Sequence, residues 1–290
     1  KREMVYIPVD IHERDKIGAK VEDGNYIDRP GGNNKRANEE MVNNENKKPT
    51  MPSIEQILNA IRQRDMFSGF QRYQYIKPGW YDLDNAMKIV EAIGKSRNPA
   101  FVIDDENRFA FENFIKWAHC DTSMKCLDPV SGQVIPGRLK RGIYIAGNTG
   151  TGKTWCMEIM QAYIQAIGIK VLWHNDNDPR PLYWRTIRAD GLCDVWAESG
   201  NIQQYKTAPM LAIQDLGNEP PETLYMGNRL DVVRYVIEYR GDMHAEMTFI
   251  TSNLRMGGEI LKERYGDRVS SRLQEMCNYL VIKGKDRRKL

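Results

Sequence analysis

One eight-residue stretch constrains this chain more than any other, because it fits the pattern G-x-x-x-x-G-K-[ST] at every fixed position. It consists of Gly147, Asn148, Thr149, Gly150, Thr151, Gly152, Lys153 and Thr154. Residues 141–146 before it are predicted to form a short buried strand, and residues 155–167 after it have apolar side chains at helical spacing. A strand, a glycine-rich loop and a helix in this order are the context in which the motif binds phosphates.

The glycine-rich loop predicts that the ligand is a nucleoside triphosphate. Its glycines allow backbone N–H groups to turn inward around a phosphate chain, and the N-terminus of the following helix adds positive potential. The ammonium group of Lys153 is expected to reach the β- and γ-phosphates. The hydroxyl group of Thr154 is expected to bind Mg²⁺, which makes this metal ion part of the prediction.

Strands and helices alternate after residue 141, which predicts an α/β fold with a parallel sheet and right-handed crossovers. A hydrophobic content of 41% in 290 residues is sufficient for a large core. Strands are expected at 142–146, 170–174, 209–214, 247–252 and 279–283. Helices are expected at 153–167, 183–198, 228–239, 258–265 and 267–276.

The region before this core divides into two parts by composition. Residues 1–51 are predicted to be largely disordered, because residues 18–52 are rich in polar residues and nearly free of aromatic side chains, so little apolar surface is available to offset the entropy of ordering. The short apolar piece at 5–9 fits a docking peptide, a strand added to a partner or an irrelevant upstream segment. Residues 52–98 are predicted to form a small helical region that binds a partner or DNA, and residues 99–290 the nucleotide-binding core. Ser53 and Gln56 have the spacing of a capping box at the start of a helix.

Aromatic and basic side chains gather between residues 70 and 81, and helices are expected at 84–92 and 106–117. The aromatic side chains fit packing within the domain, which we favour, or stacking on single-stranded bases. The net charge of +3 is too small to indicate nucleic-acid binding by itself. Five scattered cysteines indicate reduced thiols and a cytoplasmic protein, and no apolar run approaches the roughly 18 residues of a membrane span.

Two strands are followed by polar residues that suit nucleotide chemistry. The apolar strand from residue 210 runs into Gln214 and Asp215, and in phosphate-loop ATPases such a strand is expected beside the loop strand, with its carboxylate completing the Mg²⁺ shell. The strand before Asn253 ends in small polar residues, and this amide is suited to hold the attacking water or to touch the γ-phosphate.

Arginines follow in the C-terminal part of the chain. Arg268 and Arg272 are four residues apart, so both project from one helix face, where a forked guanidinium suits a γ-phosphate presented by a neighbouring subunit. A solvated or ion-paired surface is the alternative. The basic run 283–289 fits contact with phosphate and plain solvation equally well.

Taken in order, these motifs resemble the DnaC/IstB-like AAA+ ATPases over residues 101–289. The matching features are the glycine loop, a strand ending I-Q-D-L-G, a strand ending T-S-N, the run Y-G-D-R-V-S-S-R-L and the basic run G-K-D-R-R. The family includes helicase loaders and the ATP-binding helpers of some transposases. The resemblance implies a three-layer α/β AAA+ core and ATP-dependent assembly into rings or spirals on DNA.

The resemblance also implies a role for each matching residue. Lys153 and Thr154 would hold phosphate and Mg²⁺, Asp215 would be the acidic metal and water site, and Asn253 the polar sensor. Arg272 would be an arginine finger that acts across a subunit interface, and Arg288 lies near the position of a second sensor arginine.

One position departs from the family pattern, which usually has two adjacent acids at the end of the second motif strand. Gln214 stands in place of the first acid, so a neutral amide replaces a carboxylate. Either metal affinity and hydrolysis are weakened, or Asp215 serves as the single acid for both tasks. ATP binding is expected to survive in both cases, because Lys153 and the loop amides are intact.

The function expected from the sequence is that of an AAA+ ATPase of DNA replication, of helicase-loader type. Its partners would be DNA, single-stranded in preference to duplex, a replicative helicase and further copies of the chain. An IstB-like helper that works with a transposase is one alternative, and an ATP-gated DNA-binding assembly module with weak hydrolysis is another. A small-molecule kinase would need an acceptor pocket and a lid, for which the sequence has no convincing signature.

Overall fold

The computed structural model describes residues 53–57, 73–75, 81–173, 178–243 and 247–287. The chain divides into two compact units, residues 1–56 and 57–290. Residues 54–57 are helical, and the predicted capping box is confirmed by two reciprocal hydrogen bonds: the backbone N–H of Ser53 donates to Gln56 Oε1 (2.9 Å), and that of Gln56 to Ser53 Oγ (3.2 Å). The disorder predicted for 1–51 lies outside the described residues.

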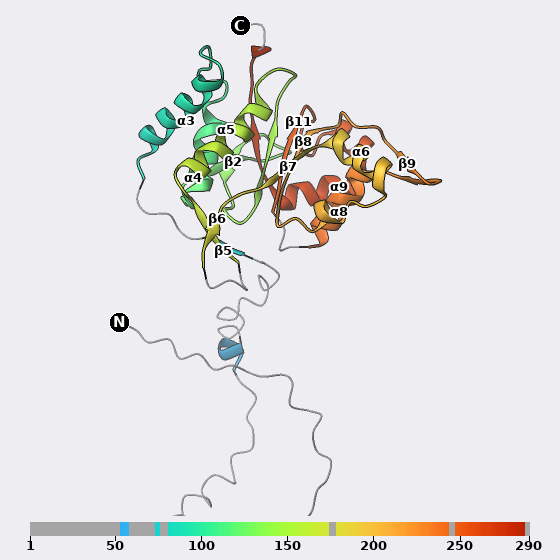
Figure 1. The fold of residues 1–290 in the computed structure, drawn as a ribbon. Helices are drawn as coiled ribbons and strands as arrows, with labels where there is room; N and C mark the ends of the chain where they lie inside the picture. The colour runs from blue at the N-terminus through green and yellow to red at the C-terminus, as the bar shows by residue number, and fades with distance from the viewer. Residues whose placement is uncertain (1–52, 58–72, 76–80, 174–177, 244–246, 288–290) are drawn as a thin grey trace, which may run out of the picture. The chain divides into compact units, whose positions relative to one another are not determined.

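A seven-stranded sheet forms the centre of the second unit, in the order β3-β2-β12-β4-β11-β8-β7 (Figure 1). The strands β12, β4, β11, β8 and β7 are parallel, and β2 and β3 extend the sheet in antiparallel fashion. Their bounds are β2 Lys125–Leu127, β3 Val134–Pro136, β4 Gly142–Ala146, β7 Arg185–Arg188, β8 Met210–Leu216, β11 Met247–Ser252 and β12 Cys277–Val281.

Helices cover both faces of this sheet, as Figure 1 shows, so the three-layer α/β fold predicted from the sequence is confirmed. Side chains alternate between two hydrophobic clusters along each strand: Ile143 and Ile145 of β4 belong to one cluster, and Tyr144 to the other. The first cluster contains α3 (Leu83–Arg97), α4 (Arg108–Ala118) and α5 (Lys153–Ala166). The second contains α6 (Ala189–Ser199), α8 (Val232–Asp242) and α9 (Glu259–Met276), and the short α7 (Gln203–Lys206) precedes β8.

The second parallel strand lies elsewhere than predicted. Residues 185–188, expected to begin a helix at 183–198, form the edge strand β7, which pairs in parallel with β8. The strand expected at 170–174 exists as β5 (Lys170–Trp173), but it belongs to a separate antiparallel sheet with β1 (Tyr73–Tyr75) and β6 (Arg180–Pro181). The sequence of β7 is Arg-Thr-Ile-Arg, and its largely exposed side chains lack the apolar run typical of a buried strand.

A second correction concerns the order of strands in the sheet. The strand that ends in Asp215 was expected beside the loop strand β4, but β11 lies between β4 and β8. The strand next to β4 is therefore β11, which is followed by Asn253. Asp215 lies in β8, one strand further from β4. Sequence order alone does not determine which parallel strand is adjacent to which.

Helices 258–265 and 267–276 were predicted with a break between them. The structure has one element, α9, with a non-helical residue at the predicted break: Gly266 has φ 84° and ψ 164°. Residues 228–230, predicted as helix, instead form β10 (Asn228–Leu230), which makes a two-stranded hairpin with β9 (Thr223–Tyr225). This hairpin extends beyond α6 in Figure 1, and Tyr225 packs edge-on against Trp196 of α6 at a centroid distance of 5.8 Å.

The helix predicted at 84–92 is confirmed as part of α3, and it shares the main core. Ala86, Met87 and Val90 are buried in the same cluster as the side chains of α5. Tyr81 also packs against the core, since it stacks on the ring of His119 at 4.0 Å and donates a 2.6 Å hydrogen bond to Asp121. For Tyr81, packing within the domain is therefore the correct interpretation, and burial with this acceptor raises the pKa of its hydroxyl group.

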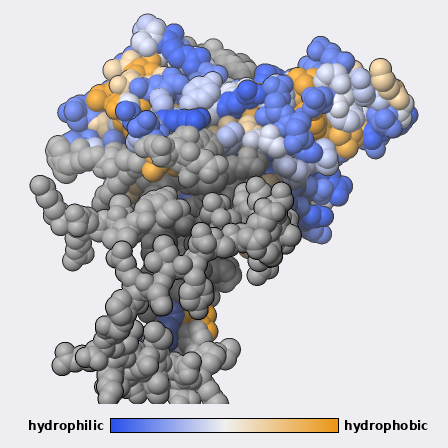
Figure 2. All heavy atoms as spheres, turned by 60° about the horizontal axis from the view of Figure 1, so that its bottom comes forward, coloured by the Kyte–Doolittle hydropathy of each residue, from blue (hydrophilic) through white to orange (hydrophobic). Residues whose placement is uncertain are grey.

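The coloured part of the surface in Figure 2 is mainly hydrophilic, with hydrophobic residues in small separate groups. None of the helices within the described ranges has the length and apolar character needed to cross a membrane.

Candidate nucleotide-binding site

The glycine-rich loop connects β4 to α5, as its sequence predicts. Gly150 and Gly152 adopt φ values of 79° and 96°, which residues other than glycine rarely adopt. At Gly147, the position of an added Cβ atom would lie 2.2 Å from the carbonyl oxygen of Ile282, so the backbone just after β12 leaves no room for a side chain. The loop conformation therefore depends on these three glycines.

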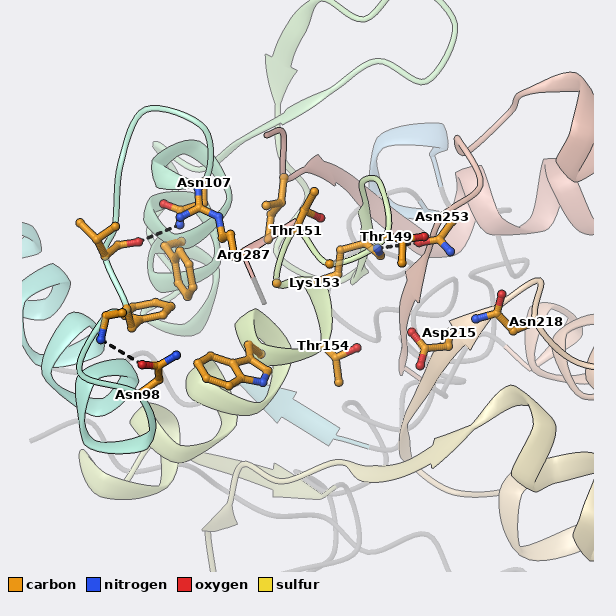
Figure 3. A pocket seen from close by; sticks show the side chains of 18 of the residues that line it. Asn98, Asn107, Thr149, Thr151, Lys153, Thr154, Asp215, Asn218, Asn253 and Arg287 are labelled. Carbon is orange, nitrogen blue, oxygen red and sulfur yellow. Dashed lines mark hydrogen bonds between the residues drawn. The ribbon is translucent and has the colours of Figure 1, made fainter. Parts of the chain in front are cut away.

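A pocket of about 520 Å³ opens beside this loop (Figure 3). One part of its wall is the loop itself, and the opposite part comes from the carboxyl ends of β7, β8 and β11. The lining residues are Asn98, Ala100, Phe101, Val102, Asn107, Phe111, residues 149–155, Arg188, Asp215, Asn218, Asn253, Ile282 and Arg287. Ligands of open α/β sheets bind at this edge, where the strands end.

Lys153 and Asn253 meet in the pocket (Figure 3). The Nζ atom of Lys153 donates to Asn253 Oδ1 (2.7 Å) and to the carbonyl oxygen of Asn148 (2.8 Å). Lys153 is only 5% exposed, so its charge is directed by these two acceptors and has little freedom to move into solvent. Two residues a hundred positions apart in the sequence are thus brought together, as expected for a phosphate-binding lysine and a polar sensor.

Thr154 and Asp215 line the same pocket, but Asp215 already has a cationic neighbour. Its Oδ2 atom lies 3.2 Å from Nη1 of Arg188, which stands at the end of β7. The backbone of Asp215 has φ 56°, and its N–H donates to Thr251 Oγ1 (3.0 Å). This left-handed conformation interrupts the side-chain alternation of β8 at the residue that reaches the pocket.

Arg188 is a pocket residue that the sequence analysis missed. Besides approaching Asp215, it donates two hydrogen bonds of 3.0 Å to Asp190, one from Nε and one from Nη2. This pairing lowers the pKa of the Asp190 carboxyl group and raises the pKa of Arg188. A basic residue in a stretch predicted to be helical gave no indication that it would lie beside the acid of another strand.

Gln214 precedes Asp215 and has a different environment. It is 6% exposed, and its Nε2 atom is buried without a hydrogen-bond partner among the described residues. A buried amide N–H group without an acceptor costs about 1–3 kcal/mol, so this position is one that an acceptor would stabilise.

The two arginines assigned from the resemblance lie differently from the pocket residues. Arg272 does not line the pocket; it pairs with Asp242 at the end of α8 and, at 3.4 Å, with Glu275. Arg268 pairs with the same Asp242 at 3.1 Å. Arg288 lies outside the described residues, so its assignment stays a prediction.

The residue before it, Arg287, does line the pocket. Its backbone N–H donates to the carbonyl oxygen of Gly150 (2.9 Å), which fixes the C-terminal segment to the phosphate loop. Its guanidinium donates to both carboxylate oxygens of Asp104 at 2.7 and 2.8 Å and approaches Glu106 at 3.3 Å. The hydrogen bonds from Arg287 hold the pKa of Asp104 below its ordinary value.

Aromatic side chains form one wall of the pocket, and they come from parts of the chain that precede Asp215. Phe101 lies 6.4 Å from the ring of Trp155 and 5.8 Å, edge-on, from that of Phe111. The guanidinium of Arg97 lies over the Trp155 ring at 4.9 Å. Such a flat apolar wall is suited to a nucleotide base. The position of Trp155 directly after the motif was the only sequence signal for it.

No family model and no curated protein matches this chain. Among solved structures it is similar to a protein described as a primosome component of Streptococcus pyogenes serotype M3, with 17% identity over 63% of this chain and 83% of that one and a TM-score of 0.44. It is also similar to the DnaC helicase loader, with 18% identity, coverage of 64% and 95% and a TM-score of 0.42. A third is the replication initiator DnaA bound to AMPPCP and single-stranded DNA, with 16% identity, coverage of 72% and 52% and a TM-score of 0.41.

Proposed function

We propose that this chain binds and hydrolyses ATP as an AAA+ protein of DNA replication, of helicase-loader type, and assembles on DNA when ATP is bound. The observation that carries the proposal is the meeting of Lys153, Asn253 and Asp215 at one pocket beside the glycine-rich loop. Three different elements supply these groups, and their chemistry is that of phosphate binding and of positioning a water molecule for attack.

In the proposed reaction each residue has its own task. Lys153 would bind the β- and γ-phosphates, and the backbone N–H groups of the loop would surround them. Asn253, already held at 2.7 Å from Lys153, would contact the γ-phosphate or orient the attacking water. Asp215 would accept the proton of that water, for which its carboxylate has to turn from Arg188.

The residues at the site are compatible with Mg²⁺, although the protein contributes few ligands. Thr154 and Asp215 offer oxygen atoms at the same pocket, and oxygen is the ligand type that Mg²⁺ prefers. When bound, the ion would neutralise charge on the phosphates. Gln214, as a neutral amide, would contribute less to holding it than a carboxylate.

Arg272 would act on the nucleotide of a neighbouring copy. It lies among the residues of α9 that pair with Asp242, and not among those that line this chain's own pocket. A finger in this position would couple nucleotide state to assembly, because it reaches phosphate only when two copies adjoin. Arg272→Ala should therefore spare ATP binding and abolish ATP-dependent assembly.

The partners proposed for the assembly follow from the sequence resemblance. They are single-stranded DNA and a replicative helicase, with residues 52–98 as the partner-binding part and the cytoplasm as the place of action. An IstB-like transposition helper would bind duplex DNA and a transposase instead. The ATP-gated module with weak hydrolysis is the alternative favoured by a specific observation, namely that Asp215 pairs with Arg188 while Gln214 is neutral.

The test is ATP hydrolysis by the purified chain, with and without single- and double-stranded DNA, with oligomer size measured in the same samples. DNA-stimulated hydrolysis together with ATP-dependent assembly would support the motor or switch. Assembly without hydrolysis would support the gated module. If ATP causes neither assembly nor a response to DNA, the protein is a monomeric nucleotide-binding protein and the replication proposal is wrong.

A further inference from the structure

The pocket contains very little negative charge of its own. Among the residues that the structure describes as lining it, Asp215 is the single acid, whereas three cations, Lys153, Arg188 and Arg287, line the same space. A divalent ion at this pocket would therefore be held mainly by the phosphates of the nucleotide.

The single acid has a cationic side chain of the protein beside it, which it shares with Asp190. Arg188 Nη1 lies 3.2 Å from Asp215 Oδ2, and the remaining guanidinium atoms are fixed by the two hydrogen bonds to Asp190. The three-point arrangement orients the Arg188 side chain toward the pocket even though it is 56% exposed. A planar, permanently charged fork is suited to bridge two carboxylates in this way.

Gln214 reinforces this distribution of charge. A carboxylate here would add a second negative charge next to Asp215, and a metal ion would then be needed to prevent repulsion between the acids and the triphosphate. The amide adds no charge, and its buried Nε2 atom is a hydrogen-bond donor, which satisfies an anion or a water oxygen and not a cation.

We propose that this chain binds ATP nearly as well without a divalent metal ion as with one, because the guanidinium of Arg188 faces the Asp215 carboxylate in place of the metal. The inference rests on the proposed nucleotide site and deepens it. With a pair of acids, ATP binding and ATP hydrolysis would both depend on the metal ion. Metal-independent binding would separate them, so that ATP binds first and hydrolysis follows when the metal ion is present. Arg188 is a positioning and charge-balancing residue in this scheme.

The experiment measures the dissociation constant of a fluorescent ATP analogue in EDTA and in Mg²⁺, using the full chain. For the wild type we expect the two constants to agree within about threefold. In Arg188→Ala, the bare Asp215 carboxylate faces the phosphates, so the ratio of the EDTA constant to the Mg²⁺ constant should rise by about tenfold. The double variant Arg188→Ala/Asp215→Asn removes the uncompensated charge and should return the ratio to the wild-type value.

The control is Arg185→Ala, on the same strand. Arg185 pairs with Gln204 and lies outside the pocket lining, so the ratio should not change. A wild type that binds the analogue only in Mg²⁺ would overturn the inference, as would an Arg188→Ala variant that loses affinity equally in both buffers or a double variant that leaves the ratio raised. Absence of binding in both buffers, with no difference from Lys153→Ala, would instead reject the nucleotide site itself.

Discussion

The two sides of the pocket differ in how they are held. On the phosphate-loop side, Lys153 is 5% exposed and is fixed by Asn148 and Asn253. On the acid side, Asp215 is partly exposed and pairs with Arg188, whose side chain is 56% exposed. The first side is rigid because burial and backbone geometry determine it. The second is an ion pair near solvent, where screening keeps interactions weak and rearrangement is easy.

This difference indicates which side of the pocket controls ATP binding and which controls the rate of hydrolysis. Groups fixed by burial are suited to hold the triphosphate in one position, whereas a carboxylate in an exchangeable ion pair is suited to be switched. Variants on the loop side should therefore weaken ATP binding, and variants on the acid side should change turnover while ATP binding in Mg²⁺ is largely retained.

The largest effect is expected from Lys153→Ala. The variant removes the buried cation between the loop and Asn253, and ATP affinity should fall by about a hundredfold or more. Titration with the fluorescent ATP analogue measures it, and Lys262→Ala, which removes a surface lysine paired with Glu259, is the matched control. Tight ATP binding by Lys153→Ala would remove the basis for calling the loop side the binding side.

Asp215→Asn is expected to have the next largest effect, and to lower the rate of hydrolysis without weakening ATP binding. The amide cannot accept the proton of the attacking water, so hydrolysis should fall by about 10²-fold or more. ATP affinity should stay the same or increase, because a negative charge near the phosphates is lost. A steady-state phosphate-release assay and a binding titration together separate the two quantities, and a weakened affinity at unchanged rate would reverse the comparison.

The sequence predicted the loop side well because its chemistry is encoded locally. The phosphate loop, α5 and the strand before Asn253 all lie where the motif and the apolar pattern place them. Arg188 could not be found in this way, since the edge strand β7 has exposed, polar side chains and no periodicity that marks it as a strand. Its partner Asp215 belongs to another strand, and pairing between strands is a property of the tertiary fold.

The aromatic wall permits a sharper test of what the loop side contributes. In Trp155→Ala the flat surface for the base is lost, so affinity for ATP should decrease by about tenfold. Affinity for inorganic tripolyphosphate, measured by competition, should not decrease, because the phosphate contacts remain. Equal losses for both ligands would mean that Trp155 supports the loop conformation and does not contact the base.

The side chain of Asn253 lies between the two sides of the pocket, and Asn253→Ala is expected to have a smaller effect on ATP binding and hydrolysis. Lys153 loses its hydrogen bond to Asn253 but keeps the one to the carbonyl oxygen of Asn148, so ATP affinity should change by less than about fivefold. The rate of hydrolysis should fall by about tenfold, because an amide that orients water or phosphate is lost. Asn218→Ala, at another amide of the pocket wall, is a comparison that distinguishes a specific role from general loss of polarity.

The smallest effect is expected where the C-terminal segment meets the pocket. Arg287 donates two hydrogen bonds to Asp104, and these lower the pKa of that carboxyl group. A carboxyl group whose pKa is lower in the folded state stabilises the fold above its ordinary pKa of about 3.9, and this contribution is lost as the pH falls through the lower, folded-state pKa. Asp104 is partly exposed, so Asp104→Asn should reduce the free energy of unfolding by no more than about 1 kcal/mol at neutral pH.

Urea unfolding of wild type and Asp104→Asn between neutral and acid pH measures this contribution. The difference between the two proteins should be constant above about pH 5 and should shrink in more acid solution, where the wild-type carboxylate becomes protonated. Asp105→Asn, at the neighbouring exposed acid, controls for a general change of surface charge. A difference that persists unchanged into strong acid would mean that Asp104 acts through its backbone turn and not through its ion pair with Arg287.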